Sequence, residues 1–135
     1  MGFAALILLD THAWIWFVSD PSKLSRPARK AIEAAIVGDG FGVSAISVWE
    51  VALLVLKNRL DLNIPVREWV RRCQLLPYLR VFPLDGHTLL CAAELKGMHA
   101  DPADRFIVAT AQVRQLSIVT KDTKIRDYAG VTTLW

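Results

Sequence analysis

The sequence has few residues that could form disulfides or zinc sites, because it contains only two cysteines and three histidines. Two cysteines, Cys73 and Cys91, make no disulfide framework, and neither they nor the histidines have the spacing of a zinc motif. We therefore expect a reducing compartment, the cytoplasm. G-x-S-x-G turns and Walker loops are also missing, which argues against the main serine-hydrolase and nucleotide-binding classes.

Long hydrophobic runs are missing as well. No apolar run approaches the roughly 20 residues that span a bilayer, so we expect no membrane association through a helix. The first apolar run, residues 3–9, has no basic segment before it and ends on Asp10, which argues against a secretory signal. Nevertheless, 53% of the residues are hydrophobic. This surplus indicates apolar surface buried against a partner, in a homodimer or a complex.

Charge of either sign is not in large excess, since the net charge is +3 at pH 7. Such a balance permits binding to a phosphate backbone without requiring it. A length of 135 residues suits one domain, residues 1–135, with a hydrophobic core of its own.

Strand-like and helix-like segments alternate along the chain. The expected strands are residues 4–9, 41–45, 79–82, 117–120 and 131–134. Four helices are expected at residues 26–37, 48–60, 66–75 and 102–115. A fifth is expected to start at Asp85 or His87 and to end at Lys96, with Gly97 as its C-cap. Two short helices are expected, one through Trp14 and Trp16 and one after Asp122. This alternation predicts the α/β class, a three-layer α/β/α sandwich around a mainly parallel sheet of about five strands.

Four acidic residues stand at or near the points where expected strands give way to helices: Asp10, Glu50, Asp104 and Asp122. Right-handed crossovers bring such junctions to one edge of a parallel sheet, where ligands bind. Clustered carboxylates repel one another unless a cation neutralises them, and Mg²⁺ prefers oxygen ligands. The arrangement therefore predicts a divalent-metal site at that edge.

Each acid also has a structural explanation. Residues 47–50 fit a capping box, S-x-x-E, in which Glu50 reaches back to a backbone N–H. Asp101 suits an N-cap with Asp104 in the third helical position, and Asp10 and Asp122 suit N-caps of the short helices that follow them. The two roles are compatible, because a helix N-terminus keeps a carboxylate ionised.

Four stretches in this order carry a resemblance to a known family. They are residues 8–12 (LLDTH), 44–52 (SAISVWEVA), 99–111 (HADPADRFIVATA) and 119–122 (VTKD). Together they resemble the PIN domain and, more narrowly, the VapC-like ribonuclease toxins of bacterial and archaeal toxin–antitoxin pairs. The match spans nearly the whole chain.

The resemblance implies a PIN-like fold and an endoribonuclease that depends on Mg²⁺ or Mn²⁺. It implies Asp10, Glu50 and Asp104 as the core catalytic and metal-binding acids, and Asp122 as a fourth position that is less constant in the family. It also implies an RNA substrate, a cognate antitoxin that blocks the acidic pocket, and a homodimer. Thr11 and Thr120 are candidate hydroxyl donors to a metal-bound water or a phosphate, or else caps of their own helices.

Other residues have simpler interpretations. We expect His12 to pack at a helix start rather than to touch substrate, and His87 and His99 to be solvated or capping. We expect the tryptophans at positions 14, 16, 49 and 69 to fill the core or an interface, with RNA stacking a distant alternative. The basic residues Lys57, Arg59, Arg67, Arg71 and Arg72 suit either a solvated helix face or a phosphate-contacting surface.

Three alternative functions were weighed. A receiver-type phosphoacceptor domain needs an acidic pair after the first strand, whereas Thr11 follows Asp10. A haloacid-dehalogenase-like phosphatase needs an aspartate at position 12, which is histidine. A non-catalytic PIN-fold module that binds RNA or a partner is excluded least well, although three intact core acids argue against it.

Overall fold

The computed structural model describes residues 6–98 and 101–135. Its sheet has five strands, all parallel to their neighbours, in the order β3-β2-β1-β4-β5. The strands are β1 (Ile7–Leu9), β2 (Phe41–Ser44), β3 (Leu79–Phe82), β4 (Ile118–Val119) and β5 (Thr133–Leu134). The predicted parallel sheet of about five strands is confirmed, with β1 at its centre.

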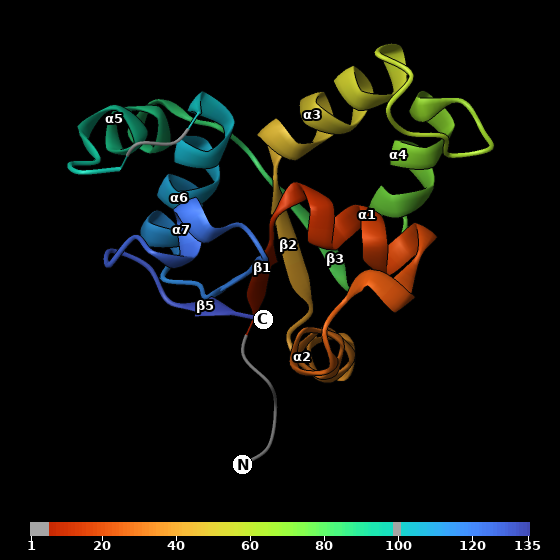
Figure 1. Ribbon diagram of the computed structural model, residues 1–135, viewed down its shortest axis with the longest axis horizontal. Helices are drawn as coiled ribbons and strands as arrows, with labels where there is room; N and C mark the ends of the chain where they lie inside the picture. Colours follow the sequence, from red (N-terminus) through yellow and green to blue (C-terminus); the bar gives the residue numbers. More distant parts are fainter. Residues whose placement is uncertain (1–5, 99–100) are drawn as a thin grey trace.

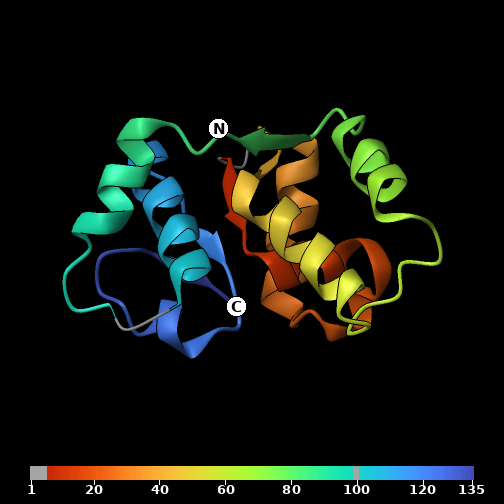
Figure 2. The same cartoon turned by 90° about the horizontal axis from the view of Figure 1, so that it is seen from above.

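Helices cover both faces of the sheet (Figures 1 and 2). One side carries α1 (Thr11–Ser19), α2 (Arg26–Val37) and α4 (Val66–Gln74), with a 3₁₀ turn at Pro21–Lys23, and the other carries α5 (Gly86–Glu94), α6 (Pro102–Arg114) and α7 (Thr123–Arg126). Helix α3 (Ala45–Leu56) extends from the carboxyl end of β2 and contacts both α1 and α6. The predicted α/β/α sandwich is therefore confirmed.

The central strand β1 shows how the sheet separates two cores. Successive side chains of a strand point to opposite faces. Accordingly, Ile7 and Leu9 pack in one cluster with Trp14 of α1, whereas Leu8 packs in the other with Ile107 of α6. Because β1 is buried on both faces, its sequence is a continuous apolar run rather than an alternating one.

Most expected elements occur where the sequence placed them. Helix α2 has the predicted bounds, since Ser25 caps it and Gly38 follows its last residue. Strand β3 also has its predicted bounds. Strand β1 is shorter than the expected 4–9: Leu6 lies before it, and residues 4 and 5 lie outside the described residues. His99, in the third motif, also lies outside them.

Two helices were predicted with wrong bounds. The helix expected over 48–60 begins at Ala45 and ends at Leu56, because the Ser44 hydroxyl accepts a hydrogen bond from the Ile46 N–H and caps it. The helix expected to reach Lys96 with Gly97 as its cap is α5, which ends at Glu94 with Leu95 as its C-cap. Its start at the Asp85 cap is one of the two starts considered.

Within residues 6–98 and 101–135, no helix combines the length and apolar character needed to cross a membrane. Cys73 and Cys91 are both free thiols, as the sequence predicted.

Candidate active site

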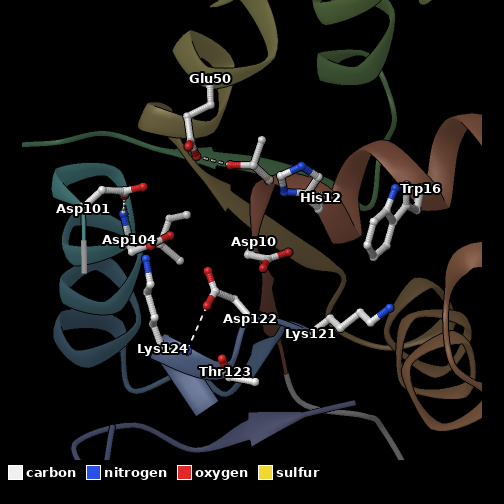
Figure 3. Close-up of a pocket in the computed structure, with 12 residues that line it drawn as sticks. Asp10, His12, Trp16, Glu50, Asp101, Asp104, Lys121, Asp122, Thr123 and Lys124 are labelled. Atoms are coloured by element: carbon white, nitrogen blue, oxygen red, sulfur yellow. Dashed lines mark hydrogen bonds between the residues drawn. The ribbon is translucent and has the colours of Figure 1, made fainter. Parts of the chain in front are cut away.

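A pocket of about 530 Å³ opens at the carboxyl ends of β1 and β4 (Figure 3). Twelve residues line it: Asp10, Thr11, His12, Trp16, Glu50, Asp101, Asp104, Ile107, Lys121, Asp122, Thr123 and Lys124. The four predicted acids are all among them. The structure thus brings together residues that lie up to 112 positions apart in the chain (from 10 to 122).

Asp10 is the most deeply placed acid, with 7% of its surface exposed. One carboxylate oxygen, Oδ1, accepts a hydrogen bond from the Ala13 N–H at 2.8 Å and caps α1, as predicted. The other, Oδ2, accepts one from the Thr120 hydroxyl at 2.5 Å. Burial raises the pKa of Asp10, and these two hydrogen bonds oppose that rise. The Asp10 side chain therefore both caps α1 and lines the pocket.

Glu50 does not belong to a capping box, contrary to the sequence prediction. Because α3 begins at Ala45, Ser47 lies inside the helix rather than at its cap, and Glu50 lies in the second turn. The Glu50 carboxylate instead accepts a hydrogen bond from the Thr11 hydroxyl, which also lies 2.8 Å from the Ser47 hydroxyl. Burial raises the pKa of Glu50, and Thr11 opposes the rise.

Asp104 occupies the third position of α6, as predicted. Its backbone N–H donates to the Asp101 carboxylate at 3.0 Å, so Asp101 is the helix cap. The pKa of the Asp104 carboxyl is also raised, and strongly. Burial first, and then repulsion from Asp101, Asp122 and Glu50, raise its pKa to about 7. Near neutral pH this carboxyl therefore exists partly in its protonated form.

Asp122 caps the short helix α7, since its carboxylate accepts the Lys124 N–H at 2.8 Å. Its own N–H donates to the Thr120 hydroxyl at 3.0 Å. Thr120 is fully buried, and it therefore links the Asp10 carboxylate to the Asp122 backbone. Thr11 and Thr120 thus each donate a hydrogen bond to an acid of the pocket.

The donor set of the pocket suits a hard cation. Four side-chain carboxylates line the pocket, and burial together with repulsion from neighbouring acids raises the pKa of Asp10, Glu50 and Asp104. In the described part of the chain, no three acidic, histidine or cysteine side chains converge closely enough to hold one ion between them. Mg²⁺ commonly uses one or two carboxylates and retains several waters. The residues therefore fit a partly hydrated ion better than a closed cage.

The other predictions made for single residues have mixed outcomes. Trp14 and Trp69 are core residues, at 0% and 5% exposed, as expected. Trp49 is 56% exposed, so it is not a core residue, and its alternative placement in an interface stays a prediction. His12 lies against Trp16 at the start of α1 but is exposed and lines the pocket, so the expected packing is only partly confirmed. Among the basic residues, the side chains of Arg71 and Arg72 pair with Glu68 on an exposed helix face.

Sequence reasoning missed several functional neighbours of the acids. Lys121 and Lys124 line the pocket beside Asp122, and Trp16 forms part of its wall. Lys121 lies within the last motif and Lys124 two residues after it, and their position after a strand end was a usable signal. Trp16 lies four residues after His12 and therefore on the same helix face, a signal that was also present.

Arg105 has a positioning role that sequence reasoning did not assign. Its guanidinium donates to the carbonyls of Ala92, Ala93, Leu95 and Met98, with nitrogen–oxygen distances of 2.8 to 3.4 Å. These include carbonyls at the end of α5 that lack helical partners. Arg105 therefore ties the end of α5 and the segment after it to the first turn of α6, beside Asp104.

Comparison with known proteins identifies the family of this chain. The family model described as PIN domain matches residues 7–131. The chain belongs to the PIN domain family. This PIN domain is 37% identical over 123 residues to Ribonuclease VapC22 from Mycobacterium tuberculosis, covering 90% of this chain and 91% of the relative.

Solved structures resemble this PIN domain over nearly their whole length. FitAcB from Neisseria gonorrhoeae matches with a TM-score of 0.68 and 26% identity, over 94% of this chain and 95% of that one. VapBC2 from Rickettsia felis, solved bound to a DNA fragment from its promoter, matches with a TM-score of 0.70 over 96% of this chain and 97% of that one. Its identity is 14%, so that likeness concerns the fold alone.

The raised pKa of Asp104 leads to a prediction about the stability of the metal-free PIN domain. The folded-state pKa, about 7, lies above the usual value of 3.8. Between about pH 4 and pH 7 the unfolded chain therefore binds fewer protons than the folded one, so stability falls as the pH rises. Asp104→Asn should weaken this fall in stability, because it removes the carboxyl group that loses its proton. At pH 8 we expect the variant to be more stable than the wild type by only on the order of 1 kcal/mol, since solvent partly screens the half-buried site.

Urea denaturation in EDTA, from pH 5 to pH 8, measures this effect. Asp39→Asn is the matched control. Asp39 is exposed and precedes β2, so it lies at the amino ends of the strands, whereas the pocket lies at their carboxyl ends. An Asp104→Asn protein whose stability declines with pH as steeply as that of the wild type would contradict the prediction.

Proposed function

We propose that this protein is a cytoplasmic endoribonuclease that uses Mg²⁺ or Mn²⁺ to hydrolyse RNA phosphodiester bonds, and that it is the toxin of a toxin–antitoxin pair. One observation carries the proposal: Asp10, Glu50, Asp104 and Asp122 line a single pocket at the carboxyl ends of the strands. The relationship to Ribonuclease VapC22, at 37% identity, supports the choice of RNA as substrate.

The proposed roles follow from the contacts of each acid. One or two of the four carboxylates would bind the ion directly and the others through its waters, with Thr120 orienting Asp10 and Thr11 orienting Glu50. When bound there, a divalent ion would supply an activated water and neutralise charge on the phosphodiester. Asp101 stays the cap of α6 and holds the Asp104 backbone in place. Because Asp10 and Glu50 are each fixed by a neighbouring hydroxyl, the site is ordered before substrate arrives.

The test is cleavage of end-labelled single-stranded RNA by the purified protein in Mg²⁺, in Mn²⁺ and in EDTA. We expect cleavage with either ion, loss of cleavage in EDTA, and recovery when excess Mg²⁺ is returned. A parallel preparation of the Asp39→Asn protein should behave as the wild type does.

Two outcomes would count against the proposal. Cleavage that continues undiminished in EDTA would rule out the metal-dependent mechanism. RNA binding without cleavage, under every ionic condition, would instead support the non-catalytic RNA-binding module.

The antitoxin partner is supported by an apolar hollow on the surface. A pocket of about 560 Å³ between α3 and α4 is lined by the apolar residues Val48, Ala52, Leu56, Val66 and Val70, together with Arg67, Arg71 and Gln74. Leu56, at its edge, is 75% exposed. We propose that an apolar antitoxin segment covers this hollow and extends to the acidic pocket.

In the same cleavage assay, the product of a neighbouring small reading frame should suppress RNA cleavage, and Leu56→Glu should weaken that suppression.

A homodimer is proposed on similar grounds. Leu89 and Leu90 of α5 are 42% and 64% exposed, on the far side of the molecule from α4 (Figure 2). Apolar residues exposed side by side often mark an interface. Sedimentation equilibrium of the purified chain decides the point, and a monomer across micromolar concentrations would refute the dimer.

A further inference from the structure

Two aromatic rings form one wall of the acidic pocket. His12 and Trp16 lie one turn apart on α1, and their ring centroids are 5.6 Å apart with the planes tilted by 52°. Trp16 is half-buried, and Trp135 lies against it with a centroid separation of 5.9 Å. Figure 3 shows His12 and Trp16 on the side of the pocket opposite Asp101 and Asp104.

Core packing accounts for only part of this pair of rings. Trp14, two residues before Trp16, is the tryptophan of α1 that fills the core, whereas His12 is exposed. Trp16 is partly buried, and it is held in place by its contacts with Trp135 and with the core cluster that contains Trp14. An aromatic surface that is fixed from behind and open toward a pocket suits stacking by a flat ligand.

Two lysines supply positive charge at the same pocket. Lys121 and Lys124 are exposed, and they extend in opposite directions from Asp122 in Figure 3, with Lys121 on the Trp16 side. The ion pairs found among the described residues all involve Glu68, so neither lysine is paired within that part of the chain. Unpaired lysines beside a carboxylate cluster would offset its repulsion of a polyanion.

We propose that His12 and Trp16 form a platform for one unpaired nucleobase of the RNA, which places its face on one ring and its edge against the other, tilted ring, while Lys121 contacts a phosphate next to that base. The inference rests on the proposed ribonuclease function and specifies its substrate class, a single-stranded segment or loop. In a duplex both faces of a base are covered by its neighbours, whereas an unpaired base can place one face on an aromatic ring.

The probe for the platform is a fluorescein-labelled 12-nucleotide RNA of repeated AAC, which cannot pair with itself. It is compared with an abasic ribose-phosphate chain of the same length and charge. Binding is measured by fluorescence anisotropy in EDTA, so that affinity is read without metal-dependent cleavage. The wild type should bind the RNA about five- to a hundredfold more tightly than the abasic chain, the range that stacking of one base supplies.

The variants separate stacking from general damage. Trp16→Leu and His12→Ala should lose most of this preference while binding the abasic chain as the wild type does. Trp16→Phe, which keeps a ring, should retain most of it. Trp49→Leu is the matched control, because Trp49 is exposed but does not line the pocket, and it should change nothing. Lys121→Ala should weaken the binding of both probes equally. It should also lower the salt dependence of the binding constant by about one released counterion.

Three results would overturn the platform: equal binding of RNA and abasic chain by the wild type, full base preference in a folded His12→Ala protein, or equally tight binding of an RNA duplex. His12→Ala keeps the test decisive even if Trp16→Leu does not fold, because His12 is exposed. The cleavage assay separates this idea from the proposed function. Base-dependent binding without cleavage defeats the ribonuclease, whereas cleavage without base preference defeats the platform.

Discussion

Asp10→Asn is expected to lower the rate of RNA cleavage about a thousandfold. Asp10 is the most buried of the four acids, and it directly follows β1, the central strand of the sheet. Replacing its carboxylate by an amide removes the charge that would bind a divalent ion there. A metal ion contributes several kcal/mol to a phosphoryl-transfer transition state, and each 1.4 kcal/mol is about tenfold in rate.

The fold should survive this substitution. The amide oxygen of asparagine can still accept the hydrogen bond from the Ala13 N–H that caps α1. Its NH₂ group can donate to the Thr120 hydroxyl, which then accepts where it formerly donated. Because burial raises the pKa of Asp10, a neutral side chain is no less compatible with the site than a charged one.

Single-turnover cleavage at saturating Mg²⁺ measures the effect, with thermal unfolding in EDTA as the check on folding. Asp39→Asn makes the same chemical change at the opposite edge of the sheet and should leave the rate unchanged. A folded Asp10→Asn protein that cleaves within tenfold of the wild-type rate would show that Asp10 is not central to the reaction.

Arg105→Ala is expected to destabilise the protein by about 2 to 4 kcal/mol. The guanidinium makes five hydrogen bonds to four backbone carbonyls, and a hydrogen bond to a charged group contributes about 1.5 to 3 kcal/mol, although such contributions do not simply add. Its loss would leave carbonyls at the end of α5 without partners and would remove a favourable positive charge from that helix terminus.

Urea denaturation measures this loss, with Arg29→Ala as the control. Arg29 is exposed near the start of α2, so its truncation should change stability by less than about 0.5 kcal/mol. Arg105→Lys should fall between the two, because an ammonium group cannot reproduce the planar fork of donors. Equal stability of the Arg105→Ala and Arg29→Ala proteins would mean that the carbonyls find other partners at no cost.

Local sequence patterns predicted most of the fold. Ser25, Pro27 and the glycines after Val37 define both ends of α2, and the structure has those ends. The N-caps at Asp10, Asp101 and Asp122 were also predicted, and each accepts a backbone N–H of the helix that it precedes. These features depend on a few neighbouring residues, which is why the sequence alone displays them.

The errors occurred where two local signals competed. Ser44 and Ser47 are both acceptable caps of α3, and the capping-box pattern favoured Ser47. Strand β2 ends at Ser44 because it pairs with β3 as far as Phe82, so the helix begins three residues earlier than predicted. That pairing moves Glu50 into the second turn, where Thr11 is its partner.

By itself, the sequence determined the α/β class, the order of the elements and the placement of carboxylates at strand ends, because all three follow from local periodicity and from the handedness of crossovers. Only the tertiary structure decided which hydroxyl holds which carboxylate. The Thr120–Asp10 bond joins residues 110 positions apart, and no local pattern encodes it. The raised pKa of Asp104 and the exposure of His12 beside Trp16 likewise depend on which surfaces packing buries and which it leaves open.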